Sequence, residues 1–244
     1  MPYLTELHCH TGEVSQCASI KNDELIDVYV GAGYTSLTIT NHLSRFTFGE
    51  KNRDKYKGSD NWEEKIEFFL GGVTHAAEAA KGRLNILWGV ELRSNTDNND
   101  YLIHHVTKEF LLSHPTLLDE KVRIVAEWVR DAGGLFCQAH PFRDNMKVKN
   151  HLLFDATEVY NGSNNHDSHN DLALVWAKRF DLTMLSGSDY HRQGPPPTGG
   201  ILTDEPIRTN DELYDVLVHR RFTPLHPGEM PVYYDAKIDE DIKK

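Results

Sequence analysis

The feature that most constrains the fold is the alternation of short apolar runs and longer amphipathic stretches along the chain. Seven runs have the length and composition of buried strands, at residues 3–8, 36–40, 86–90, 101–106, 135–139, 157–160 and 183–186. Strands separated by helices need crossover connections, which give a mainly parallel sheet. We therefore expect a single α/β domain, and about seven strands favour closure of the sheet into a barrel.

Helix signals recur between these runs. Apolar residues at helical spacing, N-cap residues and terminal glycines predict helices over 22–30, over 122–129, over 172–176, after Asn61 and after Thr209. No low-complexity linker interrupts the pattern, so the barrel is expected to span 1–234, with a charged tail at 235–244. The polar stretches 46–60 and 194–200 are predicted to be a long loop over the active face and an ordered turn or lid.

Composition excludes several classes of protein. The 244 residues carry a formal net charge of −11, which disfavours a broad contact with the phosphate backbone of an extended nucleic acid. No apolar run is long enough to span a bilayer, and no secretory leader is recognisable. The three cysteines are widely spaced and form no Cys-x-x-Cys pair, as is typical of a reducing, cytoplasmic setting. The sequence does not indicate an oligomeric state.

The first candidate site is the pair His8 and His10 at the end of the first apolar run. Side chains alternate along a strand, so both imidazoles point to one side and can reach one ion. The chain has 14 histidines, however, and a His-x-His pair can arise by chance. The pair alone does not decide between these explanations.

Ligand-type residues also follow the later strands. They are His42, Glu91, His140, Glu158, Asn161, Asp189 and His191. In parallel barrels the strand-to-helix loops emerge at the carboxyl ends of the strands, where active sites assemble. A carboxylate directly after a buried run, such as Glu91, also needs a partner or a cation to offset its desolvation. Together these positions predict a metal centre at the carboxyl edge.

The chemistry of these residues restricts the metal. Imidazoles and carboxylates without a cysteine cluster are typical of Mn²⁺, Fe²⁺ or Zn²⁺ sites, and about eight candidate ligands are too many for one ion. We therefore expect two or three divalent ions. His166 and His169 are expected at the surface or on a substrate loop. His104 and His105 are undecided, because one of them must share the strand face of Asp100 and the sequence does not show which way it points.

Six motifs, in order, resemble those of the polymerase and histidinol phosphatase superfamily, called PHP. They are Glu-Leu-His8-Cys-His10-Thr, Ile-Thr-Asn-His42, Gly-Val-Glu91, Ala-His140-Pro-Phe-Arg143, Glu158-Val-Tyr-Asn161-Gly and Gly-Ser-Asp189-Tyr-His191. The resemblance implies a distorted (β/α)7 TIM-like barrel with a trinuclear metal centre that hydrolyses phosphoesters. Carried over by position, it implies the metal ligands His8, His10, His42, Glu91, His140, Asp189 and His191.

The chain departs from the family pattern in two places. The segment after His10 lacks the usual Ser-Asp-Gly turn or nearby His, and Glu13 is the predicted substitute ligand. Cys17, in the same segment, is a possible ligand, although a buried thiol is the commoner role. In the strand after Glu91, where the family often carries a His before a Leu-Gly pair, the chain has Asp100 and His104-His105 instead. These departures leave the occupancy of one metal position open.

The predicted reaction follows from this centre. Two or more divalent ions lower the pKa of a bound water, so that a metal-bound hydroxide would attack phosphorus in line with the leaving alkoxide. Glu91 is expected to bridge two ions. The leaving group would be protonated by His191 or His42, and the sequence does not select between them.

Substrate contacts are expected from arginines beside the ligands, because a guanidinium binds phosphate bidentately. The candidates are Arg143, Arg45 and Arg192, together with Asn161. The substrate is expected to be a phosphomonoester of a small metabolite or nucleotide. The alternatives are an amidohydrolase, which would need a bridging Lys where Glu91 stands, a catalytically silent metal-binding regulatory domain, and a polymerase-associated exonuclease module.

Overall fold

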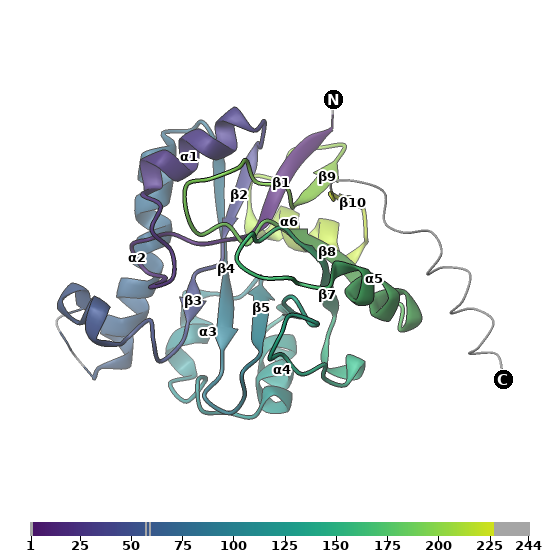
Figure 1. Ribbon diagram of the computed structural model, residues 1–244. Coiled ribbons are helices and arrows are strands. Elements are labelled where there is room, and N and C mark those ends of the chain that lie inside the picture. The colour runs from purple at the N-terminus through teal and green to yellow at the C-terminus, as the bar shows by residue number, and fades with distance from the viewer. Residues whose placement is uncertain (1, 57, 59, 227–244) are drawn as a thin grey trace.

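The computed structural model describes residues 2–56, 58 and 60–226, so the predicted tail at 235–244 lies outside the described residues. One ten-stranded sheet curls into a nearly closed barrel with helices around it (Figure 1). Its strands are β1 (Tyr3–Cys9), β2 (Ser36–Ile39), β3 (His42–Leu43), β4 (Asn85–Arg93), β5 (Asp100–His104), β6 (Leu135–Gln138), β7 (Ala156–Asn161), β8 (Thr183–Gly187), β9 (Ile201–Thr203) and β10 (Thr223–Pro224). The expected single-domain barrel is confirmed, and all seven predicted strands are present.

The helices occupy the predicted stretches, with one addition. They are α1 (Asn22–Gly31), α2 (Trp62–Ala80), α3 (Lys108–Ser113), α4 (Val122–Asp131), α5 (Asn170–Arg179) and α6 (Asn210–Val218), with 3₁₀ turns at Glu50–Tyr56 and His151–Leu153. The Asn61 side chain accepts a hydrogen bond from the Glu63 N–H, as expected of an N-cap. The N-cap of α1 is Lys21, which makes no side-chain cap hydrogen bond, and Asn22 is the first residue of the helix, where its side-chain amide donates to Glu13.

The sheet order is β10-β9-β1-β2-β4-β5-β6-β7-β8, with β3 beside β4. β5 runs antiparallel to both β4 and β6, which the crossover argument did not predict. The short connection at 94–99 joins β4 to β5 as a hairpin, for which no crossover is needed. Asp100, the first residue of β5, therefore pairs with Arg93, the last residue of β4. Asp100 thus lies at the edge where the parallel strands end, and His104 lies away from it.

The segment after β8 closes the barrel at this edge. The Asp189 N–H donates to the His8 carbonyl at 2.8 Å, and the His10 N–H donates to the Tyr190 carbonyl at 3.1 Å. Backbone pairing therefore fixes the first and last ligand segments side by side. The described residues contain no helix long and apolar enough to cross a membrane, and the cytoplasmic location stays a prediction.

An apolar core fills the barrel interior away from this edge. Leu7, Leu87 and Leu185 pack in one buried cluster with Leu213 and Leu217 of α6. Full burial of each such side chain contributes roughly 1.5–3 kcal/mol to folding. The interior is thus sealed by packing at one end, while the carboxyl ends of the strands carry the polar residues.

The two predicted loops take different forms. Phe46 and Thr47 line the pocket over the carboxyl edge, and the following residues form the 3₁₀ turn Glu50–Tyr56. The stretch 194–200 is anchored at its end, since a Cβ on Gly199 would come within 2.0 Å of the Gly187 backbone. Only a glycine fits there, so this end of the stretch is packed against the barrel wall and is not free to act as a lid.

Candidate metal centre

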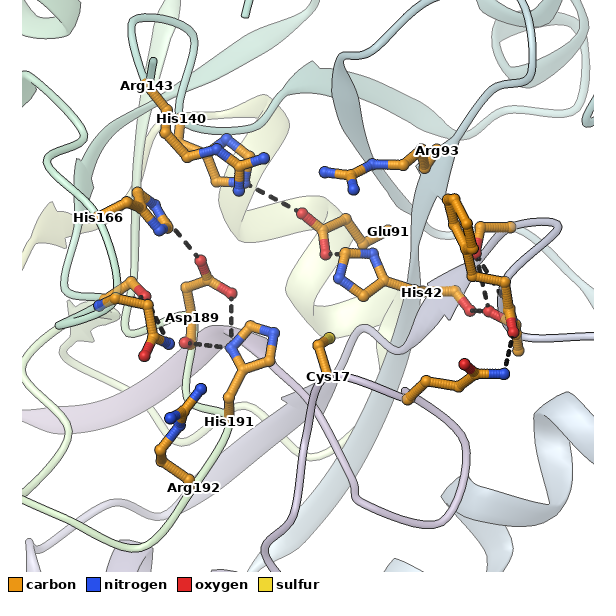
Figure 2. Close-up of a pocket in the computed structure, with 16 residues that line it drawn as sticks. Cys17, His42, Glu91, Arg93, His140, Arg143, His166, Asp189, His191 and Arg192 are labelled. Atoms are coloured by element: carbon orange, nitrogen blue, oxygen red, sulfur yellow. Dashed lines mark hydrogen bonds and ion pairs between the residues drawn. The ribbon is translucent and has the colours of Figure 1, made fainter. Parts of the chain in front are cut away.

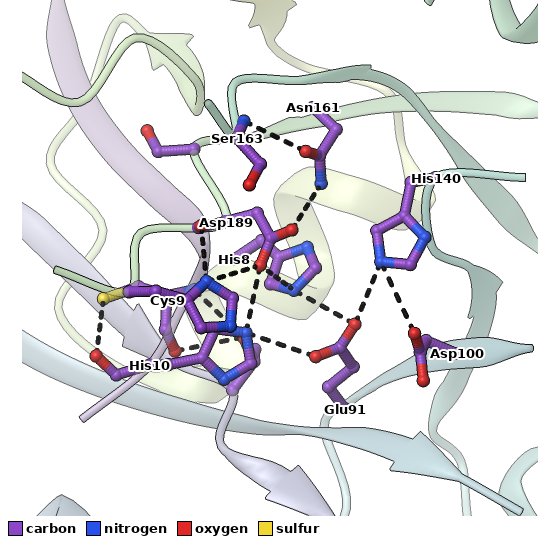
Figure 3. Close-up of polar contacts among 12 residues, drawn as sticks. His8, Cys9, His10, Glu91, Asp100, His140, Asn161, Ser163 and Asp189 are labelled. Atoms are coloured by element: carbon purple, nitrogen blue, oxygen red, sulfur yellow. Dashed lines mark hydrogen bonds and ion pairs between the residues drawn. The ribbon is translucent and has the colours of Figure 1, made fainter. Parts of the chain in front are cut away.

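Four buried side chains from three elements converge at the carboxyl edge (Figure 3). His8 and His10 come from the end of β1, Glu91 from β4 and Asp189 from the segment after β8. The Nε2 atom of His8 lies 3.3 Å from oxygens of both Glu91 and Asp189, and the Nε2 atom of His10 lies 3.2 Å from oxygens of the same two carboxylates. All four side chains are inaccessible to solvent or nearly so.

The outer ring nitrogens of both histidines are already engaged. Nδ1–H of His8 donates to Glu158 at 2.9 Å. Nδ1–H of His10 donates at 3.1 Å to the Ser15 hydroxyl, and that hydroxyl in turn donates a hydrogen bond to the Asn41 side-chain oxygen. A hydrogen bond of this kind fixes the tautomer of a metal-binding histidine. Each neutral ring therefore turns an Nε2 lone pair toward the two carboxylates.

Lone pairs facing carboxylates at 3.2–3.3 Å repel unless a proton or a cation lies between them. His10 Nε2, Glu91 Oε2 and Asp189 Oδ1 have no hydrogen-bond partner among the described residues. Although burial alone would raise it, the pKa of Asp189 is held well below its usual value by the charges of His8 and His191. Correspondingly, the pKa of His8 is raised by Asp189, Glu158 and Glu91 against the effect of burial. This donor set fits a divalent cation, which would replace the shared protons.

Two further groups extend the centre. The ligand atoms of His10, His42 and His191 all lie within 4.8 Å of one another, as do those of His42, Glu91 and Asp100. β3 pairs His42 directly with Glu91, and their side chains meet at 2.9 Å. Glu91 therefore stands between the groups, in the place expected of a bridging carboxylate.

His140 completes the other side of Glu91. Its Nε2 lies 3.2 Å from Glu91 and 3.8 Å from Asp100. His140 and Asp189 both have a positive φ, of 24° and 48°, which L-residues rarely adopt. Such backbone strain is concentrated at functional sites. The structure thus brings together all seven residues that the family resemblance implied as metal ligands.

Glu158 and Asn161 on β7 support these ligands from behind. The carboxylate of Glu158 accepts hydrogen bonds from the His8 ring, the His140 N–H and the Asn161 amide. The amide of Asn161 also reaches Asp189, at 3.3 Å. Asn161 was predicted to bind substrate, but its polar atoms are occupied by the protein. Its position therefore indicates a supporting role.

Asp100 is bound by two arginines. Arg93 forms a bidentate pair with it, and Arg143 lies 3.3 Å from its Oδ2. Both guanidinium groups are partly exposed and line the pocket (Figure 2). Sequence reasoning missed Arg93, because its side chain reaches the site only through the β4–β5 hairpin.

The pocket above the centre has a volume of about 440 Å³ and is continuous in its lining with a second pocket of about 470 Å³. Arg192 lines the first pocket and Arg45 the second, where it lies over the Phe46 ring at 4.8 Å. His166, predicted at the surface or on a substrate loop, also lines the first pocket (Figure 2), with its Nε2 3.9 Å from Asp189. Volumes of this size suit small molecules.

Comparison with known proteins shows which solved structures share the fold of this chain. No family model and no curated protein sequence matches the chain. Several solved structures, among them the following three, are similar in fold. The first is a two-domain protein of Bacteroides vulgatus containing a predicted PHP-like metal-dependent phosphoesterase, with 14% identity and a TM-score of 0.63 over 93% of this chain and 65% of that one. The second is an amidohydrolase of Chromobacterium violaceum with bound sulfate and no metal, with 17% identity and a TM-score of 0.54 over 90% of this chain and 97% of that one. The third is the lesion-specific endonuclease Q of Pyrococcus furiosus, with 12% identity and a TM-score of 0.60 over 92% of this chain and 58% of that one.

The chain has the fold of the PHP-like phosphoesterases. At these identities the likeness is one of fold, and function has to be argued from the site. The chain spans 65% of the Bacteroides protein and 58% of the Pyrococcus endonuclease, so each of those proteins is longer than the PHP-like region.

Two residues of the segment after His10, which differs from the family pattern, take unexpected places in this PHP-like barrel. The carboxylate of Glu13 lies 2.7 Å from His75 and 3.0 Å from Asn22, and it is partly exposed. Glu13 is therefore not brought to the centre, because α1 and α2 supply its partners. Cys17 is brought to the pocket instead, beside His42 and His191. Asp100, the first residue of β5, lies with His42 and Glu91 in one group, whereas His104 and His105 belong to no such group among the described residues.

Proposed function

We propose that this chain is a metal-dependent phosphoesterase that hydrolyses a phosphomonoester of a small metabolite or nucleotide. The observation that carries the proposal is the buried convergence of two Nε2 lone pairs and two carboxylates beneath a pocket with arginines on its wall. The cationic arginines suit a phosphate group, and the ligand set suits the ions that phosphoester hydrolysis uses. The fold, shared with a protein described as containing a predicted PHP-like metal-dependent phosphoesterase, agrees with this chemistry.

The residues divide into metal positions that share ligands. His8, His10, Glu91 and Asp189 would hold one divalent ion, and His42 with His191 would hold a second. Glu91, His140 and Asp100 form a third group, in which two arginines already neutralise Asp100. Two or three Mn²⁺, Fe²⁺ or Zn²⁺ ions in these positions would activate a water and polarise the phosphoryl group.

The other residues would bind and orient the substrate. Arg143 and Arg93 each contact Asp100 through guanidinium N–H groups and also line the pocket. They can therefore bind phosphoryl oxygens and stabilise charge there. His42 and His191 belong to a ligand group, which makes them poor proton donors. The Nε2 of His166 lines the same pocket, has no hydrogen-bond partner among the described residues and lies 3.9 Å from Asp189, so His166 is better placed to contact the leaving group.

The test is phosphate release from a panel of sugar, amino-alcohol and nucleotide phosphates, including nucleoside bisphosphates, by protein loaded with Mn²⁺. Activity on one substrate class that a chelator abolishes and Mn²⁺ restores would support the proposal. Glu13→Gln is a matched control, because that carboxylate lies outside the centre. Silence across the panel by protein shown to contain its metals would contradict a small phosphomonoester as substrate.

Nucleic acid is a second candidate substrate, because the fold is shared with endonuclease Q. The net charge of −11 and the small pocket favour a small molecule. Duplex DNA with an abasic lesion belongs in the same panel, and cleavage of it would replace the small substrate. The amidohydrolase alternative lacks support from the site, since none of the described residues lining the pocket is a lysine.

A further inference from the structure

Cys17 has a position that the proposed metal centre does not explain. It belongs to the connection between β1 and α1, is exposed and lines the pocket. In Figure 2 its thiol lies between the imidazoles of His42 and His191, and it interacts with both side chains. An unpaired thiol at a pocket wall is not required for packing.

The imidazoles beside Cys17 form an incomplete ligand group. His10 stacks on His191 with ring centroids 4.2 Å apart and on His42 at 4.6 Å, and their ligand atoms lie within 4.8 Å of one another. His10 is fully buried, and its Nε2 has no hydrogen-bond partner among the described residues. Because His10 is shared with the carboxylates Glu91 and Asp189, none of the described residues grouped with His42 and His191 is a third ligand that serves those two alone.

We propose that Cys17 is this third ligand and binds a divalent ion through Sγ together with His42 and His191. The inference rests on the proposed metal centre. On binding, the S–H bond breaks, its proton passes to solvent, and the sulfur lone pair forms the bond to the metal, with no change of oxidation state. A thiolate in this position favours Zn²⁺, Co²⁺ or Fe²⁺ over Mn²⁺. The segment after His10 would thus supply a sulfur ligand from Cys17. Glu13 of the same segment does not reach the centre, because it is bound to His75.

The other two cysteines are not expected to contribute to a sulfur-to-metal absorption band. Cys9 is buried, and its thiol points to the backbone carbonyl of its neighbour His10. Cys137 is buried in the apolar cluster of the barrel interior. Of the three thiols, therefore, only that of Cys17 lines the pocket. Cys137→Ala is a matched control that removes a thiol remote from the site.

The test is reconstitution of metal-free protein with Co²⁺, followed by near-ultraviolet absorption and by metal content. We expect a sulfur-to-cobalt charge-transfer band in the wild type and in Cys137→Ala, and its loss in Cys17→Ser. Cys17→Ser should also retain one ion fewer per chain after gel filtration. Iodoacetamide should alkylate Cys17 in the chelated protein and not in the Co²⁺ protein, as read by mass spectrometry.

The outcomes separate this inference from the proposed function. Bound cobalt without the band, or a band that survives in Cys17→Ser, would overturn the sulfur ligand and leave the phosphoesterase proposal standing. Failure of the wild type to bind Co²⁺ or Zn²⁺ would overturn both. A normal band in protein that hydrolyses no phosphoester would support the ligand and count against the function. Circular dichroism of Cys17→Ser excludes unfolding as the cause of a lost band.

Discussion

The carboxyl edge of the barrel and the far end of β5 carry histidines with different hydrogen bonding. Where β5 ends, His105 is bonded at both ring nitrogens, to the Gly133 carbonyl and to Asp211. At the carboxyl edge, His8 and His10 are fully buried, and the Nε2 of each has no hydrogen-bond partner in the part of the chain that the structure describes. His104, next to His105, is also buried without a hydrogen-bond partner among the described residues, but it belongs to no group of candidate ligands. At the carboxyl edge several unsatisfied imidazole and carboxylate atoms lie together, which marks this edge as a place where a ligand completes the structure.

The largest effect is expected from Glu91→Gln. Glu91 faces four imidazoles at 2.9–3.3 Å, and the neutral amide keeps its shape while removing the charge that they share. Because metal ions contribute several kcal/mol to such reactions, we expect kcat/KM for the identified phosphoester to fall at least about 10³-fold. Metal content should fall with it.

Glu13→Gln is the comparison for this loss. Its carboxylate contacts His75 and Asn22 at the surface, and we expect its activity to stay within about 2-fold of the wild type. Equal losses in the two variants would mean that the carboxyl edge is not special, and the contrast between the two regions would fail.

A smaller loss is expected from Glu158→Gln. The Glu158 carboxylate holds the His8 ring and the His140 N–H without facing the pocket. Loss of such an outer partner typically lowers metal affinity or activity about 10–100-fold. Competition with a chromogenic chelator measures the affinity directly. An unchanged affinity would show that β1 alone orients His8.

The ligand positions could be predicted because each depends on one strand. His8, Glu91 and Asp189 follow short apolar runs, and the carboxyl ends of parallel strands meet at one edge whatever the details of packing. Period-two alternation correctly placed His8 and His10 on one side. These inferences needed no knowledge of which strands are neighbours.

The remaining features depend on contacts that sequence does not carry. Whether Asp100 or His104 reaches the centre is decided by the direction of β5, which follows from a short hairpin instead of a crossover. Whether Glu13 or Cys17 faces the pocket is decided by His75 on α2, far along the chain. Arg93 was missed because its role depends on its pairing with Asp100 across that hairpin.

His104→Leu tests whether a buried histidine outside the candidate metal centre matters for stability alone. His104 is buried, and neither ring nitrogen has a hydrogen-bond partner among the described residues. It lies away from the ligands, opposite Gly89. An apolar side chain removes that unsatisfied group, so we expect the free energy of unfolding at pH 7 to rise by about 1 kcal/mol, with normal activity. Loss of bound metal would instead place His104 in the centre.

The same variant has a predicted pH dependence. Burial, and to a lesser degree the charge of His8, lowers the pKa of His104 to about 4. In the unfolded chain the pKa returns to about 6.5. Between these values the unfolded chain binds more protons, so the wild type loses stability as the pH falls. Urea unfolding at pH 7 and pH 5 should therefore show a larger advantage of the leucine variant at pH 5.

The smallest effect is expected from His105→Ala. The His105–Asp211 pair joins β5 to α6, and both side chains are at least partly exposed, at 28% and 90%. Exposed pairs contribute little because water and salt screen them, so we expect at most about 1 kcal/mol of stability to be lost. Metal content and kcat/KM should not change, because the satisfied nitrogens of His105 have no part in ligand binding. A fall in metal content would mean that the two ends of the hairpin are coupled, so that the geometry of Asp100 and Arg93 depends on how β5 is anchored at its far end.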